Sequence, residues 1–258
     1  MSVLTYLQTR SSDAVLSTFE KSSIATSIST LISRLNSYFG TSVSERFTFG
    51  SYTRDTILPR KMDELSDIDF MVVFAESGYM PQTYLDRLRR FVDTKYSTSE
   101  IRQSNPTIVL ELNHIKFELV PALKEAWGSA YKIPNNTNTW QSTNPNDFNA
   151  KLSAKHAAEG YHLKPAIRLI KFWNAKAGYV YDSYELETWI TDQWFLGCYN
   201  QRDYLFSIID KLSLPFYAAQ WRKDRLQRAK NIVADTRKLE ADGYPYSAES
   251  EIKKLIPE

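Results

Sequence analysis

Cysteine, long apolar runs and an excess of one charge are all scarce in this sequence of 258 residues. Its single cysteine, Cys198, cannot close an internal disulfide, and no cluster of cysteine and histidine has the spacing of a zinc site. No stretch approaches the ~18 apolar residues that a membrane-spanning helix needs. The N-terminal residues also lack the apolar core of a secretory signal. We therefore expect a cytoplasmic protein in a reducing compartment, with no membrane partner.

The charges nearly cancel, with 32 Lys and Arg against 30 Asp and Glu and a formal net charge of +2. A protein that binds a nucleic-acid duplex through many phosphates usually carries a clear basic excess. The balance predicts a small anionic ligand or a short strand rather than a duplex. The basic cluster from Trp221 to Arg228 is interpreted as a solvated helix face, with a nucleic-acid surface as the alternative.

Hydrophobic periodicity divides the chain into a mixed first part and a helical second part. The first part is expected to hold one long helix, several strands and a further helix. Pro121 is expected to end a strand. The polar segment 128–146 is expected to connect the two parts. The predicted helices are 11–38, bent at 22–23, 81–96, 147–159, 164–177, 183–199, 203–218, 220–242 and one from 247; the strands are 45–49, 68–74, 107–112 and 115–120. The predicted class is α+β, with a mixed sheet and helices in residues 1–130 packed on a helical lobe, residues 131–258. The long N-terminal helix would span both lobes.

Three acidic side chains carry the strongest chemical signal. Asp67 and Asp69, in SDIDF (66–70), are two apart on a predicted strand and so share one face. Two carboxylates held that close repel each other, and a cation removes the repulsion. Glu118, in KFELVPA (116–122), would complete a site for two Mg²⁺ or Mn²⁺ ions if its strand lies beside the first. Glu111, on the partner strand of the predicted hairpin, is the rival third carboxylate.

A glycine-serine turn precedes these carboxylates. Gly50 and Ser51, in FGSYTRD (49–55), stand where a predicted strand turns into a short helix. A glycine there allows close backbone approach, and the following amides and hydroxyl can hold phosphate oxygens. A lone Gly-Ser or Asp-x-Asp occurs by chance in many surface turns. Together and in this order, the motifs predict a phosphate-transfer site.

These motifs resemble the polymerase-β nucleotidyltransferase superfamily. The segment RLIKFWNAKAGYVYDSYELE (168–187) narrows the resemblance to the 2′-5′-oligoadenylate synthases and their bacterial relatives, the CD-NTases (SMODS), which make cyclic oligonucleotide signals in anti-phage defence. The resemblance implies a polymerase-β-like catalytic lobe and a helical lobe closing the nucleotide cleft. It implies that Asp67, Asp69 and Glu118 bind metal. The family more often has Asp at the third position, so that assignment depends on a side chain one methylene longer.

The resemblance also implies nucleotide contacts: Ser51, Lys171 and Ser183 on the triphosphate and Tyr184 stacked on the base. Each has an ordinary alternative. Lys171 fits a solvated helix position, Ser183 fits a helix N-cap, and Tyr184 fits a core aromatic.

The function expected from these residues is metal-dependent transfer of a nucleotide from an NTP to a hydroxyl, with release of pyrophosphate. The product expected from the resemblance is a cyclic or short linear oligonucleotide messenger, and a regulatory protein partner is a further expectation. The alternatives are transfer to a tRNA or protein acceptor, and a non-catalytic nucleotide sensor. The base, the 2′ or 3′ linkage, ring closure and the oligomeric state are left open by the sequence.

Overall fold

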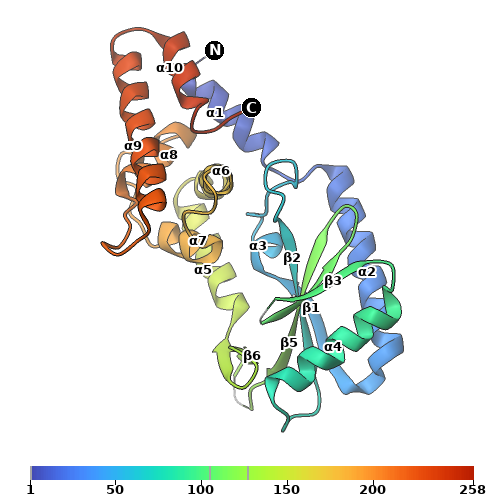
Figure 1. Ribbon diagram of the computed structural model, residues 1–258. Helices are drawn as coiled ribbons and strands as arrows, with labels where there is room; N and C mark the ends of the chain where they lie inside the picture. Colours follow the sequence, from blue (N-terminus) through green and yellow to red (C-terminus); the bar gives the residue numbers. More distant parts are fainter. Residues whose placement is uncertain (1, 105, 127) are drawn as a thin grey trace. The chain divides into compact units, whose positions relative to one another are not determined.

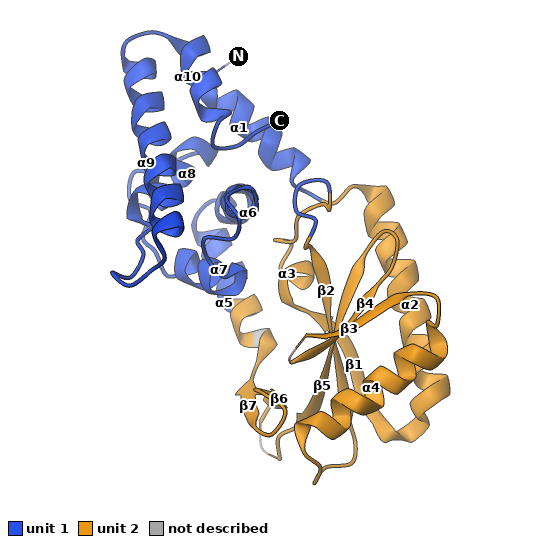
Figure 2. Ribbon diagram, in the orientation of Figure 1, with its two compact units in different colours: residues 1–15, 61–64, 151–258 blue, residues 16–60, 65–150 orange. Residues whose placement is uncertain are grey.

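The computed structural model describes residues 2–104, 106–126 and 128–258, which form two compact units (Figures 1 and 2). The sheet unit comprises residues 16–60 and 65–150; the helical unit comprises residues 1–15, 61–64 and 151–258. The predicted α+β class is confirmed. The division along the chain falls at residue 150, inside helix α5 (Pro145–Ala158), and not at the predicted residue 130.

The sheet unit is built on a mixed sheet. Its strands run in the order β1-β2-β5-β4-β3, and a β6–β7 hairpin joins through β5. The strands are β1 (Val43–Phe49), β2 (Asp67–Phe74), β3 (Glu100–Ser104), β4 (Thr107–Glu111), β5 (Lys116–Lys124), β6 (Tyr131–Pro134) and β7 (Trp140–Thr143). β2 and β5 are parallel, while the other described pairs are antiparallel.

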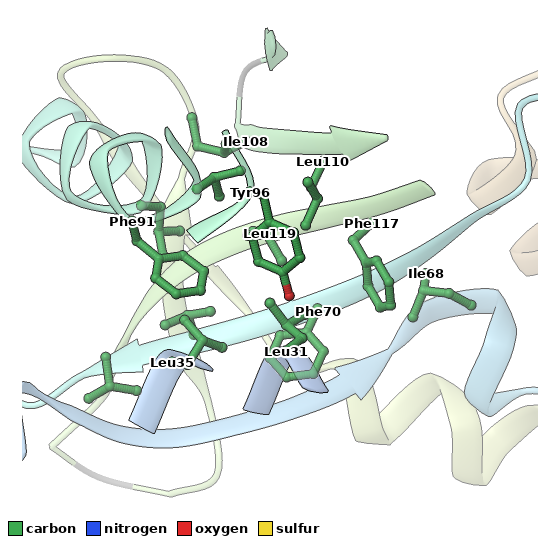
Figure 3. Packing of buried hydrophobic residues seen from close by; sticks show 14 of the residues in the cluster. Leu31, Leu35, Ile68, Phe70, Phe91, Tyr96, Ile108, Leu110, Phe117 and Leu119 are labelled. Carbon is green, nitrogen blue, oxygen red and sulfur yellow. The ribbon is translucent and has the colours of Figure 1, made fainter. Parts of the chain in front are cut away.

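Helices α2 (Thr18–Phe39) and α4 (Pro81–Lys95) cover one face of this sheet (Figure 1). Leu31 and Leu35 of α2 pack into the same cluster as Ile68 and Phe70 of β2, and all four are fully buried (Figure 3). Burying each such side chain contributes roughly 1.5–3 kcal/mol. This face is the core, so the polar side chains of the same strands are left on the opposite face.

The helical unit holds the two ends of the chain together. Its helices are α1 (Val3–Asp13), α6 (Leu163–Lys176), α7 (Ser183–Thr191), α8 (Gln201–Lys211), α9 (Gln220–Ala241), α10 (Pro245–Ile252) and the second half of α5. The buried Tyr6 hydroxyl donates to the carbonyl of Ile256 at 2.6 Å. Within the described residues, every helix is too short or too polar to span a bilayer.

The prediction of one long N-terminal helix was wrong. The chain forms α1 and α2, and Ser17 begins α2 with a capping box in which its side chain and that of Glu20 satisfy each other's backbone N–H groups. The capping box stabilises a new helix start at Ser17. The chain therefore forms two helices, although the helical spacing of apolar residues continues through the break. The break coincides with the boundary between the two units at residues 15 and 16.

Three further expectations are corrected. β5 continues past Pro121. On one edge of β5, the pairing with β4 ends before Pro121 and the pairing with β6 begins after it. Pro121 therefore needs no N–H group toward these two strands. Segment 128–146 is not only a connection, since it contains the β6–β7 hairpin. The helices predicted over 183–199 and 203–218 are shorter and end at Thr191 and Lys211.

Candidate active site

Asp67 and Asp69 lie at the start of β2, on the face opposite the core. The intervening Ile68 is fully buried on the core face, whereas both aspartates are half-buried. In the parallel register Asp69 pairs with Glu118, and Asp67 pairs with Lys116. Paired residues of neighbouring strands point to the same face. The sheet therefore brings the three predicted carboxylates to one face, which we call the carboxylate face.

Lys116 lies among these carboxylates. Its ammonium is 3.1 Å from an oxygen of Asp67 and 3.5 Å from an oxygen of Glu118, and its side chain is only 7% exposed. The pKa of Glu118 is raised above its ordinary value, because burial and the negative charge of Asp67 outweigh the attraction of Lys116. Thr107 on β4 also donates a long hydrogen bond, 3.5 Å, to Glu118.

The carboxylate face offers a partial donor set for a metal ion. Among the residues that the structure describes, no three acidic, histidine or cysteine side chains converge enough to hold an ion together. Asp67 and Asp69 supply the carboxylate oxygens that Mg²⁺ and Mn²⁺ prefer. The ammonium of Lys116 shows that a positive charge is accommodated between Asp67 and Glu118. The aspartate pair thus offers oxygens of the kind a divalent ion needs, while Glu118 is paired with Lys116.

Replacing Lys116 by methionine should lower the free energy of unfolding by about 1–3 kcal/mol in metal-free buffer, because two partly buried carboxylates lose their shared cation. Urea denaturation measures this change, and added Mg²⁺ should restore more stability to the variant than to the wild type. The control is Lys124→Met, which removes a 2.6 Å pair with Glu45 from a side chain 55% exposed. An equal loss in both variants would contradict the role given to Lys116.

The raised pKa of Glu118 predicts a pH dependence of stability. The pKa of Glu118 is higher in the folded protein than its ordinary value of 4.5. Its contribution to the free energy of unfolding is therefore complete below pH 4.5. That contribution is lost as the pH rises through the folded-state pKa. In EDTA, the free energy of unfolding of the wild type minus that of Glu118→Gln should fall between about pH 4 and pH 7. Urea denaturation at both pH values measures this difference. A difference that stays constant or rises would contradict the prediction.

Gly50 places the glycine-serine turn directly against Asp69. β1 ends at Phe49, which pairs with Asp69, and the chain then turns into the short helix α3 (Gly50–Thr53). Gly50 has φ +70°, and a Cβ atom there would lie 1.8 Å from an Asp69 carboxylate oxygen. The helix is held within the sheet unit, where Asn149 donates to the Thr53 hydroxyl at 3.1 Å. Only glycine fits this position, and it brings Ser51 next to the carboxylate face.

Glu111, the rival third carboxylate, has a different environment. It accepts a hydrogen bond from Arg60 at 2.7 Å and pairs across the sheet with Lys116. Glu118 instead pairs directly with Asp69. The register therefore favours Glu118 as the third member of the site.

The remaining predicted residues lie in the helical unit. Lys171, on α6, is not solvated: its ammonium pairs with Glu187 at 2.7 Å, and the two side chains are 7% and 1% exposed. Asp182, and not Ser183, is the N-cap of α7, accepting from two backbone N–H groups. Tyr184 is 56% exposed in the first turn of α7 and is not a core aromatic. Their contacts with a nucleotide stay predictions.

From the sequence alone, Glu118 could also be an exposed strand residue paired with Lys116 or a neighbour; the burial of Lys116 and its contact with Asp67 were missed. A lysine in a strand is normally interpreted as solvated, because lysine is almost never fully buried without a partner. Its signal was its position two residues before Glu118, which gives both side chains the same face.

Comparison with known proteins matches residues 1–155 to the family described as Second Messenger Oligonucleotide or Dinucleotide Synthetase domain, SMODS. A probable cyclic nucleotide synthase of Bacillus cereus (strain VD146) is 26% identical over 182 residues, which are 56% of this chain and 54% of that protein. The chain thus spans about half the length of this curated relative.

Solved structures of CD-NTases share the fold. The E. coli MS115-1 CdnC:HORMA-deltaN complex contains a chain with a TM-score of 0.74 and 15% identity, covering 98% of this chain and 96% of that one. CdnG of Bradyrhizobium diazoefficiens, a CD-NTase in complex with GTP, has a TM-score of 0.74 and 13% identity and covers 98% of both chains.

Proposed function

This chain belongs to the family of Second Messenger Oligonucleotide or Dinucleotide Synthetase domains, and from that membership we propose that it is a metal-dependent nucleotidyltransferase that converts NTPs into a cyclic or short linear oligonucleotide messenger. The observation that carries the proposal is the carboxylate face, where Asp69 stands beside both Glu118 and Gly50. Nucleotide transfer needs metal-binding carboxylates next to a phosphate-holding turn, and here Asp69 is the register partner of Glu118 and lies against Gly50.

Each residue of the carboxylate face has a distinct task in this proposal. Asp67 and Asp69 hold the divalent ions, with Glu118 as the third ligand. When bound, these ions supply positive charge to the phosphates and to the attacking hydroxyl. The backbone N–H groups after Gly50 and the hydroxyl of Ser51 hold the phosphate oxygens. The proposal also gives Glu118 the task of accepting the proton of the attacking hydroxyl at Oε1 or Oε2, because a carboxylate beside the metal ions is within reach of that hydroxyl.

The helical unit contributes the remaining contacts in the proposal. Tyr184, whose ring is more than half exposed, stacks on the base, and Ser183 donates to the triphosphate. Lys171 reaches the phosphates only if its pair with Glu187 opens, so its charge serves the buried carboxylate in the absence of a nucleotide. A protein partner and a role in anti-phage signalling complete the proposal; the complex of CdnC with HORMA-deltaN shows that a protein of this fold takes a protein partner.

The test is incubation with the four α-labelled NTPs and Mg²⁺ or Mn²⁺, followed by phosphatase and chromatography. A phosphatase-resistant nucleotide product supports the proposal. Label on an added tRNA or protein would favour the macromolecular acceptors. Tight NTP binding without turnover under every metal and partner condition would identify a nucleotide sensor and contradict the proposal.

A further inference from the structure

A cavity of about 180 Å³ lies within the helical unit, at the end of α6, the side of α9 and the C-terminal segment. Its floor is apolar, since Trp173, Ile232 and Leu255 are between 2% and 5% exposed. None of its lining residues belongs to the carboxylate face. The cavity is therefore a feature that the proposed transfer reaction leaves unused.

Four cationic side chains line this cavity: Lys176 from α6, Arg225 and Arg228 from α9, and Lys254 after α10. Arg225 and Arg228 are three residues apart, which places them on one side of the helix. In the part of the chain that the structure describes, no acidic side chain lines the cavity, and Lys176, Arg225 and Arg228 make no ion pair. Lys254 does have an acidic partner, Glu251 at 2.5 Å.

Like charges gathered around one cavity repel each other, and a bound anion removes that repulsion. Arginine presents a planar set of donors that matches the oxygens of a phosphate, and lysine adds a point charge. The cavity is a single hollow with an apolar floor, and the net charge of the chain is only +2. These features fit one compact polyanion better than the long backbone of a nucleic acid.

An aromatic side chain lies beside the cavity. Trp221 precedes Arg225 by one helical turn and is 48% exposed. Its ring stands 4.0 Å from where a Cβ atom of Gly178 would lie, and Gly178 directly follows Ala177 of the cavity lining. A half-exposed ring one helical turn from Arg225 offers a surface on which a nucleobase can stack.

We propose that this cavity is a binding site for a small phosphorylated anion, held by Lys176, Arg225 and Arg228. The shared chemistry is a phosphate or diphosphate group, and its sources are free pyrophosphate or the phosphate tail of a nucleotide. The proposal does not depend on nucleotidyl transfer, because the cavity and the carboxylate face have no residue in common.

The test is calorimetric titration of the full chain with pyrophosphate, ATP, adenosine and a single-stranded oligonucleotide. The titrations are made in EDTA with a protein that carries Asp67→Asn and Asp69→Asn. These two conditions prevent phosphate from binding through metal ions at the carboxylate face. Because a hydrogen bond to a charged group typically changes binding by about tenfold or more, Arg225→Gln/Arg228→Gln should weaken pyrophosphate and ATP binding at least about tenfold. The control is Lys238→Gln, an exposed position of the same helix outside the cavity, which should bind as the parent does. Thermal unfolding without ligand checks that each variant is folded.

Comparing the ligands of the titration shows whether the bound phosphate comes from free pyrophosphate or from a nucleotide. Equal affinity for pyrophosphate and ATP identifies the phosphate group alone as the ligand, whereas tighter ATP binding that is lost in Trp221→Ala identifies a nucleotide. Binding of the oligonucleotide alone would overturn the proposal in favour of a nucleic-acid surface. Absence of binding, or binding unchanged in the double arginine variant, would also overturn it.

Discussion

Replacing Asp67 and Asp69 together by asparagine should lower the rate of pyrophosphate release from NTPs by about a thousandfold or more. The reason is electrostatic. Asparagine keeps the size of aspartate but removes both negative charges that the proposal uses to hold divalent ions at the start of β2. Transition-state charge that metal ions stabilise by several kcal/mol would then be uncompensated. The measurement is the initial rate of pyrophosphate release, at saturating NTP and across a range of Mn²⁺ concentrations.

The fold should survive this double substitution. Both aspartates are only half-buried and lie opposite the core. Lys116 loses its pair with Asp67 but keeps Glu118, and the mutual repulsion of the two aspartates is removed. Asp93→Asn is the matched control, because this exposed carboxylate sits on α4, which packs on the other face of the sheet. Asp93→Asn should release pyrophosphate at the wild-type rate. Full activity in the double variant would contradict the assignment of the site.

Replacing Gly50 by alanine should be nearly as damaging, although it adds a single methyl group. The new Cβ atom would overlap an oxygen of Asp69 at 1.8 Å, and alanine at φ +70° is strained in addition. Either Asp69 moves off the carboxylate face or the turn that carries Ser51 moves away from it. We expect activity to fall by about a hundredfold or more, since a displacement of about 1 Å has that effect in a catalytic site. The free energy of unfolding should fall by about 1–3 kcal/mol.

Gly40 provides the control for this substitution. It also has a positive φ, +54°, but a Cβ atom there would meet nothing within 4 Å. Gly40→Ala therefore introduces the backbone strain without the collision, and should lose stability while keeping pyrophosphate release. Equal losses of activity in the two variants would show that strain, and not the contact with Asp69, explains the effect of Gly50→Ala.

The period-two pattern of SDIDF and KFELVPA was enough to predict the carboxylate face, because alternation along a strand is a local property. Which other strands pair with these two could not be predicted, because that depends on contacts between residues far apart in the sequence. β3 was missed because EIRQS is a polar edge strand, and the β6–β7 hairpin was missed because its Asn, Pro and Thr residues are typical of turns. Edge strands need fewer apolar residues, so their composition resembles that of loops.

The contacts of charged side chains could not be predicted for a different reason. Lys116 and Lys171 are both nearly buried, and each is stabilised by acidic partners from another element: Asp67 on β2 for the first, Glu187 on α7 for the second. A single sequence does not show which oppositely charged residues meet after folding. The break before Ser17 was also missed, because the spacing of apolar residues continues across it and only the capping box of Ser17 and Glu20 marks the start of a new helix.

The most direct test of the central claim is to compare the labelled products of wild-type protein with those of the Asp67→Asn/Asp69→Asn variant, after incubation with all four NTPs and Mn²⁺. Phosphatase treatment and chromatography with mass detection identify what each has made. The account predicts a phosphatase-resistant oligonucleotide from the wild type and only dephosphorylated nucleosides from the variant. The same product from both proteins would show that the chemistry does not occur at these aspartates.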